Sequence, residues 1–451
     1  MARGLALVVV LLIAVSEVLG KAQTTKHRFS YGSCFKHRLM NEDTRIMLKI
    51  NEDAPDSFAW LGDFAYADVM KFVKFTPIVY HVINSEEGLR NSFSASYHDQ
   101  NYTVLRTNNK TKIYGIWDDH DSGINDGGKD NPVKDIVRKV FLDSMDEPKD
   151  SPRRTRKGGM YEAYYLDPDR TIKLILLDGR YSRDELHLSD MKEKDKSSLG
   201  EEQEKWLEQE IANSTAVVTM IANGYQILPE DRPFSEKFYP KSRAHLLNLL
   251  HKYPHTKYLL LSGDVHWAET MTDPCSTDLL GYPLRELTSS GLTHSIEGMI
   301  GKIIPPTLDF LFPDTYSIAA DRYMKENYAI IDFDITDNNK FNIDFQVRNI
   351  DGHPIINRRW TERDFGVDGK KIPDSNTRLQ MYSECKKRQG SRTWRRVQNM
   401  LGKGLSLLHP FSYMLIVVIL FLRWLLLLVL GLIKRLLCRR KQAEAEKVKT
   451  G

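Results

Sequence analysis

Polar side chains that bind metal ions or transfer protons recur directly after short apolar segments of this sequence. Six apolar segments are followed by clusters of this kind. The candidate residues in these clusters are Cys34, Asp63, Tyr66, Asp118, Asp119, His120, Asp121, Asn223, Asp264 and His266. One Gly-Asp pair after a strand is a common turn, but six clusters in register are hard to explain as turns. Carboxylates at this density repel one another and need cations, so the set predicts a metal site.

The donor types indicate the chemistry of that site. A set of Asp, His and Asn residues with a thiol and a phenol suits two metal ions, one of them hard and oxidised. We therefore predict a dinuclear hydrolase site with Asp63 as the bridge. Two metal ions about 3.5 to 4 Å apart can bind a phosphate ester, activate water and stabilise both oxygens of an in-line displacement. We interpret His120 as the general acid for the leaving oxygen, oriented by Asp121. Arg180 would fork onto the non-bridging phosphate oxygens.

The elements that must position these residues follow an α/β pattern, because short β-branched runs alternate with helical patterns. The predicted strands are residues 27–32, 58–61, 113–117, 172–177, 216–222, 257–261, 328–335 and 341–347, and the predicted helices are 132–145, 200–211 and 241–253. Ligands bind beyond the carboxyl ends of strands in open α/β sheets, so the six clusters should converge on one site. No repeat or linker divides the interior, which favours one large domain.

Five segments carry the chemical residues in a fixed order. They are Gly32-Ser33-Cys34, Trp60-Leu61-Gly62-Asp63-Phe64-Ala65-Tyr66-Ala67-Asp68, Trp117-Asp118-Asp119-His120-Asp121, Leu177-Asp178-Gly179-Arg180 and Ser262-Gly263-Asp264-Val265-His266-Trp267. Their order and spacing resemble the motifs of the PhoD-type alkaline phosphatases and phosphodiesterases, within the calcineurin-like metallophosphoesterases. The resemblance covers residues 29 to 350 and includes the stretch from Thr288 to His294. It implies a β-sandwich core flanked by helices.

The resemblance also implies roles for individual residues. It assigns metal ions to Cys34, Asp63, Tyr66, Asp119, Asn223, Asp264 and His266. The first three would bind a ferric ion, and the second metal would be Ca²⁺ or another divalent ion. His120 matches the catalytic histidine of the superfamily. Gln226 is an alternative to Asn223, because the wider superfamily has a histidine ligand at this place. Two departures are Gly179 in place of the usual Thr and Asp121 in place of the common Glu.

The two ends of the chain carry signals for secretion and for the membrane. Residues 1–20 have the basic start, apolar run and small residues of a secretory signal peptide. Residues 411–433 are apolar enough to span a bilayer, although Arg423 lies near their middle. We expect a single-pass type I membrane protein. Residues 21–385 would be the luminal or extracellular phosphatase domain, 386–410 a basic spacer and 434–451 a basic cytosolic tail. Sequons at Asn101, Asn109 and Asn213 agree with this topology.

Charge and cysteine content limit the range of partners. The whole chain has a formal charge of +4, but its basic C-terminal segments leave −9 on residues 21–385. An acidic body argues against nucleic acid as a partner and makes a nuclease less suitable than a hydrolase of small phosphate esters. Another alternative is a catalytically idle receptor or adhesion ectodomain. Cys275 and Cys385 are candidates for a disulfide in an oxidising lumen, and His37, His98 and His251 are expected on the surface.

Overall fold

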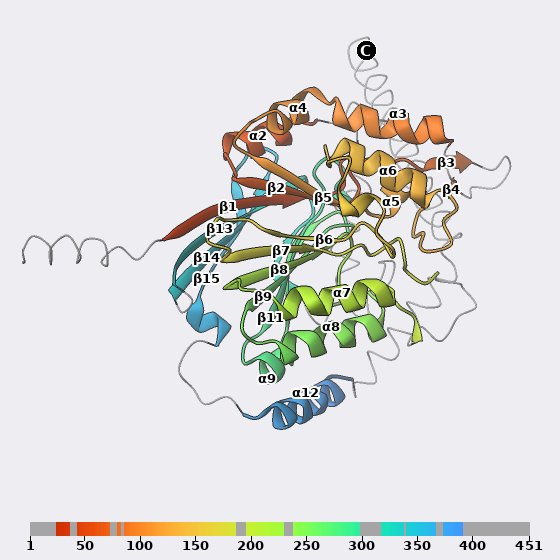
Figure 1. Cartoon of the computed structure of the whole chain (residues 1–451). Helices are drawn as coiled ribbons and strands as arrows, with labels where there is room; N and C mark the ends of the chain where they lie inside the picture. The colour runs from red at the N-terminus through yellow and green to blue at the C-terminus, as the bar shows by residue number, and fades with distance from the viewer. Residues whose placement is uncertain are drawn as a thin grey trace, which may run out of the picture.

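Two β-sheets pack face to face in the computed structural model, with helices on both outer sides (Figure 1). The structure describes residues 24–36, 43–72, 79–82, 85–185, 195–229, 238–297, 317–337, 340–366 and 373–390. The predicted α/β class is therefore confirmed, and the two-sheet core agrees with the expected sandwich. The predicted signal peptide, membrane span and cytosolic tail lie outside the described residues. Within the described ranges, no helix has the length and apolar character needed to cross a bilayer.

The first sheet has six strands. They are β1 (Thr25–Gly32), β2 (Ser57–Leu61), β5 (Lys112–Ile116), β13 (Asn327–Asp337), β14 (Lys340–Asn349) and β15 (Pro354–Thr361), in the spatial order β15-β14-β13-β1-β2-β5. Strands β1, β2 and β5 are parallel, whereas β13, β14 and β15 continue the sheet in antiparallel fashion. Buried and partly exposed residues alternate along β14, as expected for an antiparallel strand with one face toward solvent.

The second sheet has seven strands. They are β6 (Glu162–Tyr165), β7 (Ile172–Leu176), β8 (Val218–Asn223), β9 (Lys257–Ser262), β10 (Ala268–Asp273), β11 (Leu284–Ser289) and β12 (Ser317–Tyr323), in the order β12-β10-β11-β9-β8-β7-β6. Every residue of β7 and β8 is buried. Parallel strands covered on both faces read as continuous apolar runs, which is why the sequence reveals them clearly. A separate two-stranded antiparallel sheet consists of β3 (Val69–Phe72) and β4 (Val79–Val82).

Helices cover the outer faces of both sheets (Figure 1). Beside the first sheet lie α2 (Ile46–Glu52), α3 (Glu86–Tyr97), α4 (Gln100–Arg106), α5 (Asp119–Ser122) and α6 (Lys134–Ser144). Beside the second lie α7 (Glu201–Ala212), α8 (Pro240–Lys252), α9 (Ser276–Leu280) and α12 (Ser375–Gly390). All eight predicted strands and all three predicted helices are present, with ends shifted by at most two residues.

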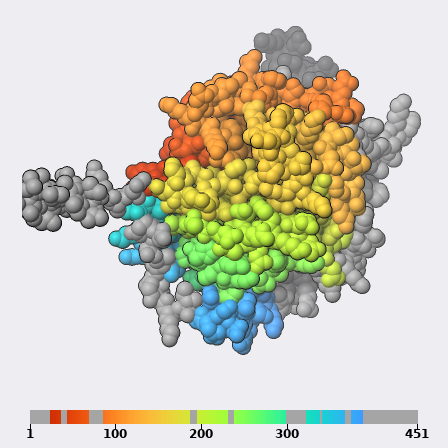
Figure 2. Space-filling model, viewed as in Figure 1, coloured from red at the N-terminus to blue at the C-terminus, as the bar shows by residue number. Residues whose placement is uncertain are grey.

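The last described helix, α12, is fastened to the body of the molecule (Figure 2). Cys275 and Cys385 form the disulfide proposed from the sequence, with their Cα atoms 5.6 Å apart. Lys386 Nζ lies 3.4 Å from Asp273 Oδ2. The predicted boundary between domain and spacer, at residues 385 and 386, therefore falls inside α12, where Lys386 still contacts the body of the molecule.

Another correction concerns His251, which the sequence analysis expected on the surface. His251 is buried between α9 and α12. Its Nδ1 lies 2.9 Å from the carbonyl oxygen of Leu279, and its Nε2 lies 2.6 Å from Ser375 Oγ. The exposed position of His98 is confirmed, and His37 lies outside the described residues.

Candidate metal centre and active site

Six strand ends, three from each sheet, converge at one end of the sandwich. The loops after β1 and β2 are joined by a bond of 2.8 Å from Phe35 N to Asp63 O, and those after β8 and β9 by a bond of 2.8 Å from Gly263 N to Gly224 O. Cys34 Sγ lies 3.6 Å from the carbonyl oxygen of Asp264 and so links the two sets. The predicted convergence is therefore confirmed, and it brings together the ends of two sheets.

Four of the predicted metal ligands have an unfavourable backbone conformation. Cys34, Asp63, Asp264 and His266 have φ values of 61°, 52°, 72° and 63°. Residues other than glycine rarely adopt positive φ, and such strain concentrates at functional sites. These sharp turns aim the four side chains immediately after their strands end.

The predicted ferric ligands lie together. Cys34 Sγ is 3.4 Å from Asp63 Oδ2 and 3.0 Å from Ser290 Oγ. Tyr66 lies in the same buried region, where its ring stacks on His120 at a centroid distance of 4.3 Å. Burial is the main cause that raises the pKa values of Cys34 and Tyr66, and nearby carboxylates raise them further. A raised pKa means that the thiol and the phenol favour their protonated forms. A bound cation favours the deprotonated forms instead.

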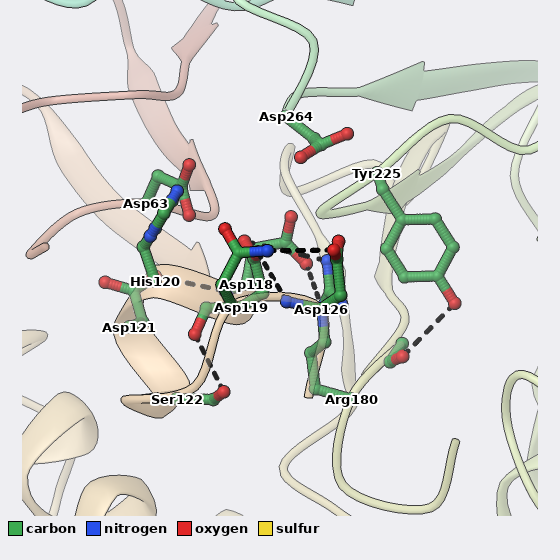
Figure 3. A network of polar contacts seen from close by, with 12 residues as sticks. Asp63, Asp118, Asp119, His120, Asp121, Ser122, Asp126, Arg180, Tyr225 and Asp264 are labelled. Carbon is green, nitrogen blue, oxygen red and sulfur yellow. Dashed lines mark hydrogen bonds and ion pairs between the residues drawn. The ribbon is translucent and has the colours of Figure 1, made fainter. Parts of the chain in front are cut away.

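Two groups of side chains have the geometry to hold a metal ion (Figure 3). One contains Asp63, Asp119 and His120, the other contains Asp118, Asp119 and Asp264, and within each group the ligand atoms lie within 4.8 Å of one another. Asp119 is common to both groups, whereas the sequence analysis favoured Asp63 as the bridge. One Asp119 oxygen accepts a hydrogen bond of 2.9 Å from Asp126 N. The other lies 3.7 Å from Arg180 Nη2.

The electrostatics of the cluster favour a cation. Burial, followed by the charges of Asp119, Asp118 and Asp121, raises the pKa of Asp63 well above its usual range. Burial alone would also raise the pKa of Asp119, but His120, Arg180 and the Asp126 amide lower it. Within the described part of the chain, the buried Asp63 Oδ1 has no hydrogen-bond partner. Because buried oxygens normally have partners, this atom and the mixed donor set fit a metal ion.

His120 is oriented by a residue that the sequence analysis did not assign. Its Nδ1 lies 3.0 and 3.1 Å from the two oxygens of Asp68, which comes from the loop after β2. Burial would lower the pKa of His120, but the charges of Asp119, Asp68 and Asp63 raise it well above its ordinary value.

The sequence analysis expected Asp121 to orient His120, but the hydrogen bonds of Asp121 go to backbone amides. The two Asp121 oxygens accept bonds from Ala65 N at 2.7 Å and Asp118 N at 3.0 Å, so this carboxylate ties the β2 loop to the β5 loop. Burial raises the pKa of Asp121 to about 7, against the lowering effect of its backbone bonds. Asp121 thus supports the backbone of the site, and its orienting role toward His120 stays a prediction.

Arg180 belongs to the acidic cluster. Its Nε donates a hydrogen bond of 2.5 Å to Asp118 Oδ1, and its guanidinium lies 4.7 Å from the centre of the Tyr225 ring (Figure 3). Both partners of this ion pair are almost fully buried. Arg180 thus offsets carboxylate charge within the site, and its contact with substrate phosphate stays a prediction.

The second sheet contributes two neighbouring histidines. His266 Nδ1 lies 2.9 Å from the carbonyl oxygen of His294. A metal-binding histidine commonly uses one nitrogen for such a bond and the other for the metal. Burial, followed by the charge of His120, lowers the pKa of His266 to about 4. His294, whose ring centre lies 4.6 Å from that of His266, was not assigned from the sequence. Its pKa is also lowered, mainly by burial.

The structure favours Asn223 over Gln226 as a ligand. Asn223 Nδ2 donates to Tyr225 O at 2.7 Å, while the buried Asn223 Oδ1 has no hydrogen-bond partner among the described residues. Gln226 Nε2 instead donates to Glu269 Oε1 at 2.7 Å and Thr288 Oγ1 at 2.9 Å. Gln226 therefore joins a buried polar network, and Asn223 keeps an oxygen for a cation.

Comparison with protein families gives an independent view of the same segments. Residues 150–299 match the sequence model of the PhoD-like phosphatases. The resemblance to the PhoD-like phosphatases is confirmed. Such a match indicates a metal-dependent phosphoesterase. The matched range includes Arg180, Asn223, Asp264 and His266, whereas the candidate residues of the first sheet lie before it.

The fold agrees with a solved PhoD structure. That structure, "Structure of PhoD", superimposes with a TM-score of 0.55 at 14% identity, over 82% of this chain and 78% of the other. At that identity the likeness concerns the fold alone. The crystal structure of TT1561 of Thermus thermophilus gives a TM-score of 0.28 at 8% identity, over 58% of this chain and 89% of the other, and supports no argument. No curated protein sequence gave a significant match.

Proposed function

We propose that this chain is a membrane-anchored, metal-dependent phosphoric ester hydrolase with a dinuclear centre. One observation carries the proposal: the two potential metal-binding groups share Asp119 at the point where six strand ends meet. Two ions that share a carboxylate are close enough to act on one phosphoryl group. The substrate is a small phosphomonoester or phosphodiester, and no nucleic acid is required.

The donor types divide between two kinds of metal ion. Cys34, Asp63 and Tyr66, together with the shared Asp119, offer a thiol, carboxylates and a phenol, which suit a hard, oxidised ion such as Fe³⁺. Asp118, Asp119 and Asp264 offer only oxygen, which suits Ca²⁺ or another divalent ion. His266 and Asn223 extend the two groups. Bound metal ions would supply charge neutralisation and an activated water molecule.

The residues of the chain itself provide proton transfer and orientation. Because Nδ1 of His120 faces Asp68, Nε2 is the atom that gives a proton to the leaving oxygen. Tyr66 stacks on the His120 ring and limits its rotation. Arg180 holds Asp118 in place through a buried ion pair. Phosphoryl transfer depends mainly on such positioning and on charge.

We place this catalytic body on the luminal or extracellular side of a secretory membrane. Disulfides such as Cys275–Cys385 persist in oxidising compartments. Asn109 and Asn213 are exposed and accessible for glycans. Asn101 is less suitable, because its Nδ2 donates a bond of 2.8 Å to Thr44 Oγ1. These features agree with the luminal location that the predicted signal peptide implies, and the span at residues 411–433 rests on the sequence alone.

A substrate screen with elemental analysis tests this function. The full-length protein, purified in detergent, should contain two metal ions per chain and hydrolyse phosphomonoesters, phosphodiesters or both. Asp119→Asn should reduce the content of both metals, while Asp150→Asn, a change of an exposed residue, should alter neither. A metal-loaded protein that turns over no phosphate ester would contradict the proposal and favour an idle ectodomain.

A further inference from the structure

Lys36 places a positive charge beside the candidate metal centre. It follows the ferric-ligand candidate Cys34 by two residues and is partly buried. Its Nζ lies 5.2 Å from the centre of the Tyr66 ring. The same ring stacks on His120 and lies 5.5 Å from the ring of His294. The ammonium group is therefore one aromatic ring away from the proposed general acid.

The backbone around Lys36 is fixed from two sides. The Phe35 amide donates a bond of 2.8 Å to Asp63 O. On the other side, Thr293 Oγ1 donates to Lys36 O at 3.1 Å, and the Thr293 amide donates to Cys34 O at 3.2 Å. These bonds join the first strand end to loops of both sheets. They keep the base of the Lys36 side chain at the edge of the site.

Lys36 differs from Arg180 in its partners. Arg180 is committed to Asp118 through a buried ion pair. Lys36, by contrast, makes no ion pair with any carboxylate of the described ranges, and its side chain contacts the Tyr66 ring. The charge of Lys36 also contributes, after burial, to the lowered pKa values of His266 and His294. An ammonium group with three donors at this position can bind an anion.

We propose that Lys36 binds a negatively charged phosphate oxygen of the substrate and selects dianionic phosphomonoesters over monoanionic phosphodiesters. The proposal rests on the function proposed above. A metal centre attracts both kinds of ester, but a monoester carries a second negative charge that a diester lacks. A cation at the edge of the site adds attraction for that second charge. Lys36 thereby makes the centre prefer monoesters.

The test compares Lys36→Met with Lys36→Arg in the full-length protein. Lys139→Met, at an exposed position of α6, is the matched control for loss of one lysine. Calorimetry measures the Kd of inorganic phosphate, and turnover measures kcat/KM for nitrophenyl phosphate and bis(nitrophenyl) phosphate. Metal content and thermal unfolding of each variant show that the centre and the fold are retained.

We expect Lys36→Met to weaken phosphate binding and to lower kcat/KM for the monoester by about tenfold to a hundredfold, mainly through KM. Turnover of the diester should change much less, Lys36→Arg should retain most of the preference, and Lys139→Met should resemble the wild type. An unchanged phosphate Kd, or equal losses on both esters, overturns the proposal. If the wild type hydrolyses neither ester, the proposed hydrolase function fails, while phosphate titration still decides whether Lys36 binds the anion.

Discussion

The contact between Asp68 and His120 makes a sharp prediction about the leaving group. Both Asp68 oxygens lie within 3.1 Å of His120 Nδ1. Asp68→Asn keeps the size of the side chain but removes one of the charges that, against the effect of burial, raise the pKa of His120. Less of the imidazole then carries the proton that Nε2 must donate. A hydrogen bond to a charged group contributes about 1.5 to 3 kcal/mol, which corresponds to about ten- to 150-fold in rate.

That loss should depend on the substrate. A poor alkoxide leaving group needs a proton, whereas a nitrophenolate hardly does. We therefore expect Asp68→Asn to slow an alkyl phosphate by about ten- to 150-fold and a nitrophenyl ester much less. His120→Ala should show the same dependence with a loss of about 10² to 10⁴ on the alkyl ester. Adding Asp68→Asn to His120→Ala should cost little more, because the two residues act through one proton.

The assay measures kcat and KM for a series of esters with leaving groups of different pKa, together with the metal content of each variant. Asp150→Asn serves as the control for the loss of an exposed carboxylate. Equal losses across the series, with unchanged metal content, would refute the orienting role of Asp68. Such a result would leave Asp68 as a structural residue of the β2 loop.

Three further predictions address the metal, the topology and the stability of the protein. If Cys34 and Tyr66 bind ferric iron, the pure protein should be coloured and Tyr66→Phe should shift or abolish the absorption band; a colourless, fully active zinc protein would contradict the iron assignment. Glycans should occupy Asn109 or Asn213, and protease added to sealed vesicles should trim only residues after Lys434; cleavage of the body would overturn the type I topology. Burial lowers the pKa of His27 below 6.5, against the opposing effects of Asp56 and Asp167. The unfolded state therefore binds this proton more readily, and the free energy of unfolding should fall as the pH drops below about 6.5. His27→Gln should reduce that slope in denaturant titrations at several pH values, and parallel curves for both proteins would argue against it.

The sequence predicted strands with continuous or alternating apolar residues, and it missed others, among them β10 and β11, which contain buried charges. Strand β11 includes Glu286, whose oxygens accept bonds from Ile227 N at 2.8 Å and Leu228 N at 2.7 Å. Strand β10 includes Glu269, which contacts Arg322 at 3.2 Å. These partners come from distant parts of the chain, so the sequence alone gives no sign that the charges are compatible with burial.

The candidate site, too, could be predicted only in part from the sequence. Its candidate metal ligands follow predictable strands, so their convergence could be inferred before the structure. The partner of His120 could not be inferred, because Asp68 and Asp121 are both near in the sequence to motif residues. Only the three-dimensional course of the β2 loop directs Asp68 to the imidazole, while backbone amides take both oxygens of Asp121.

The candidate metal centre lies between two sheets, so binding of metal ions would also affect the stability of the folded protein. Asp63 and Asp119 follow strands of the first sheet, whereas Asp264 follows a strand of the second. Any ion held by both sets binds only while the sheets are packed together, so it stabilises the native sandwich by mass action. At an ion concentration of 100 times Kd, this stabilisation reaches about 2.7 kcal/mol. Removal of the ions would therefore weaken the contact between the sheets as well as the chemistry.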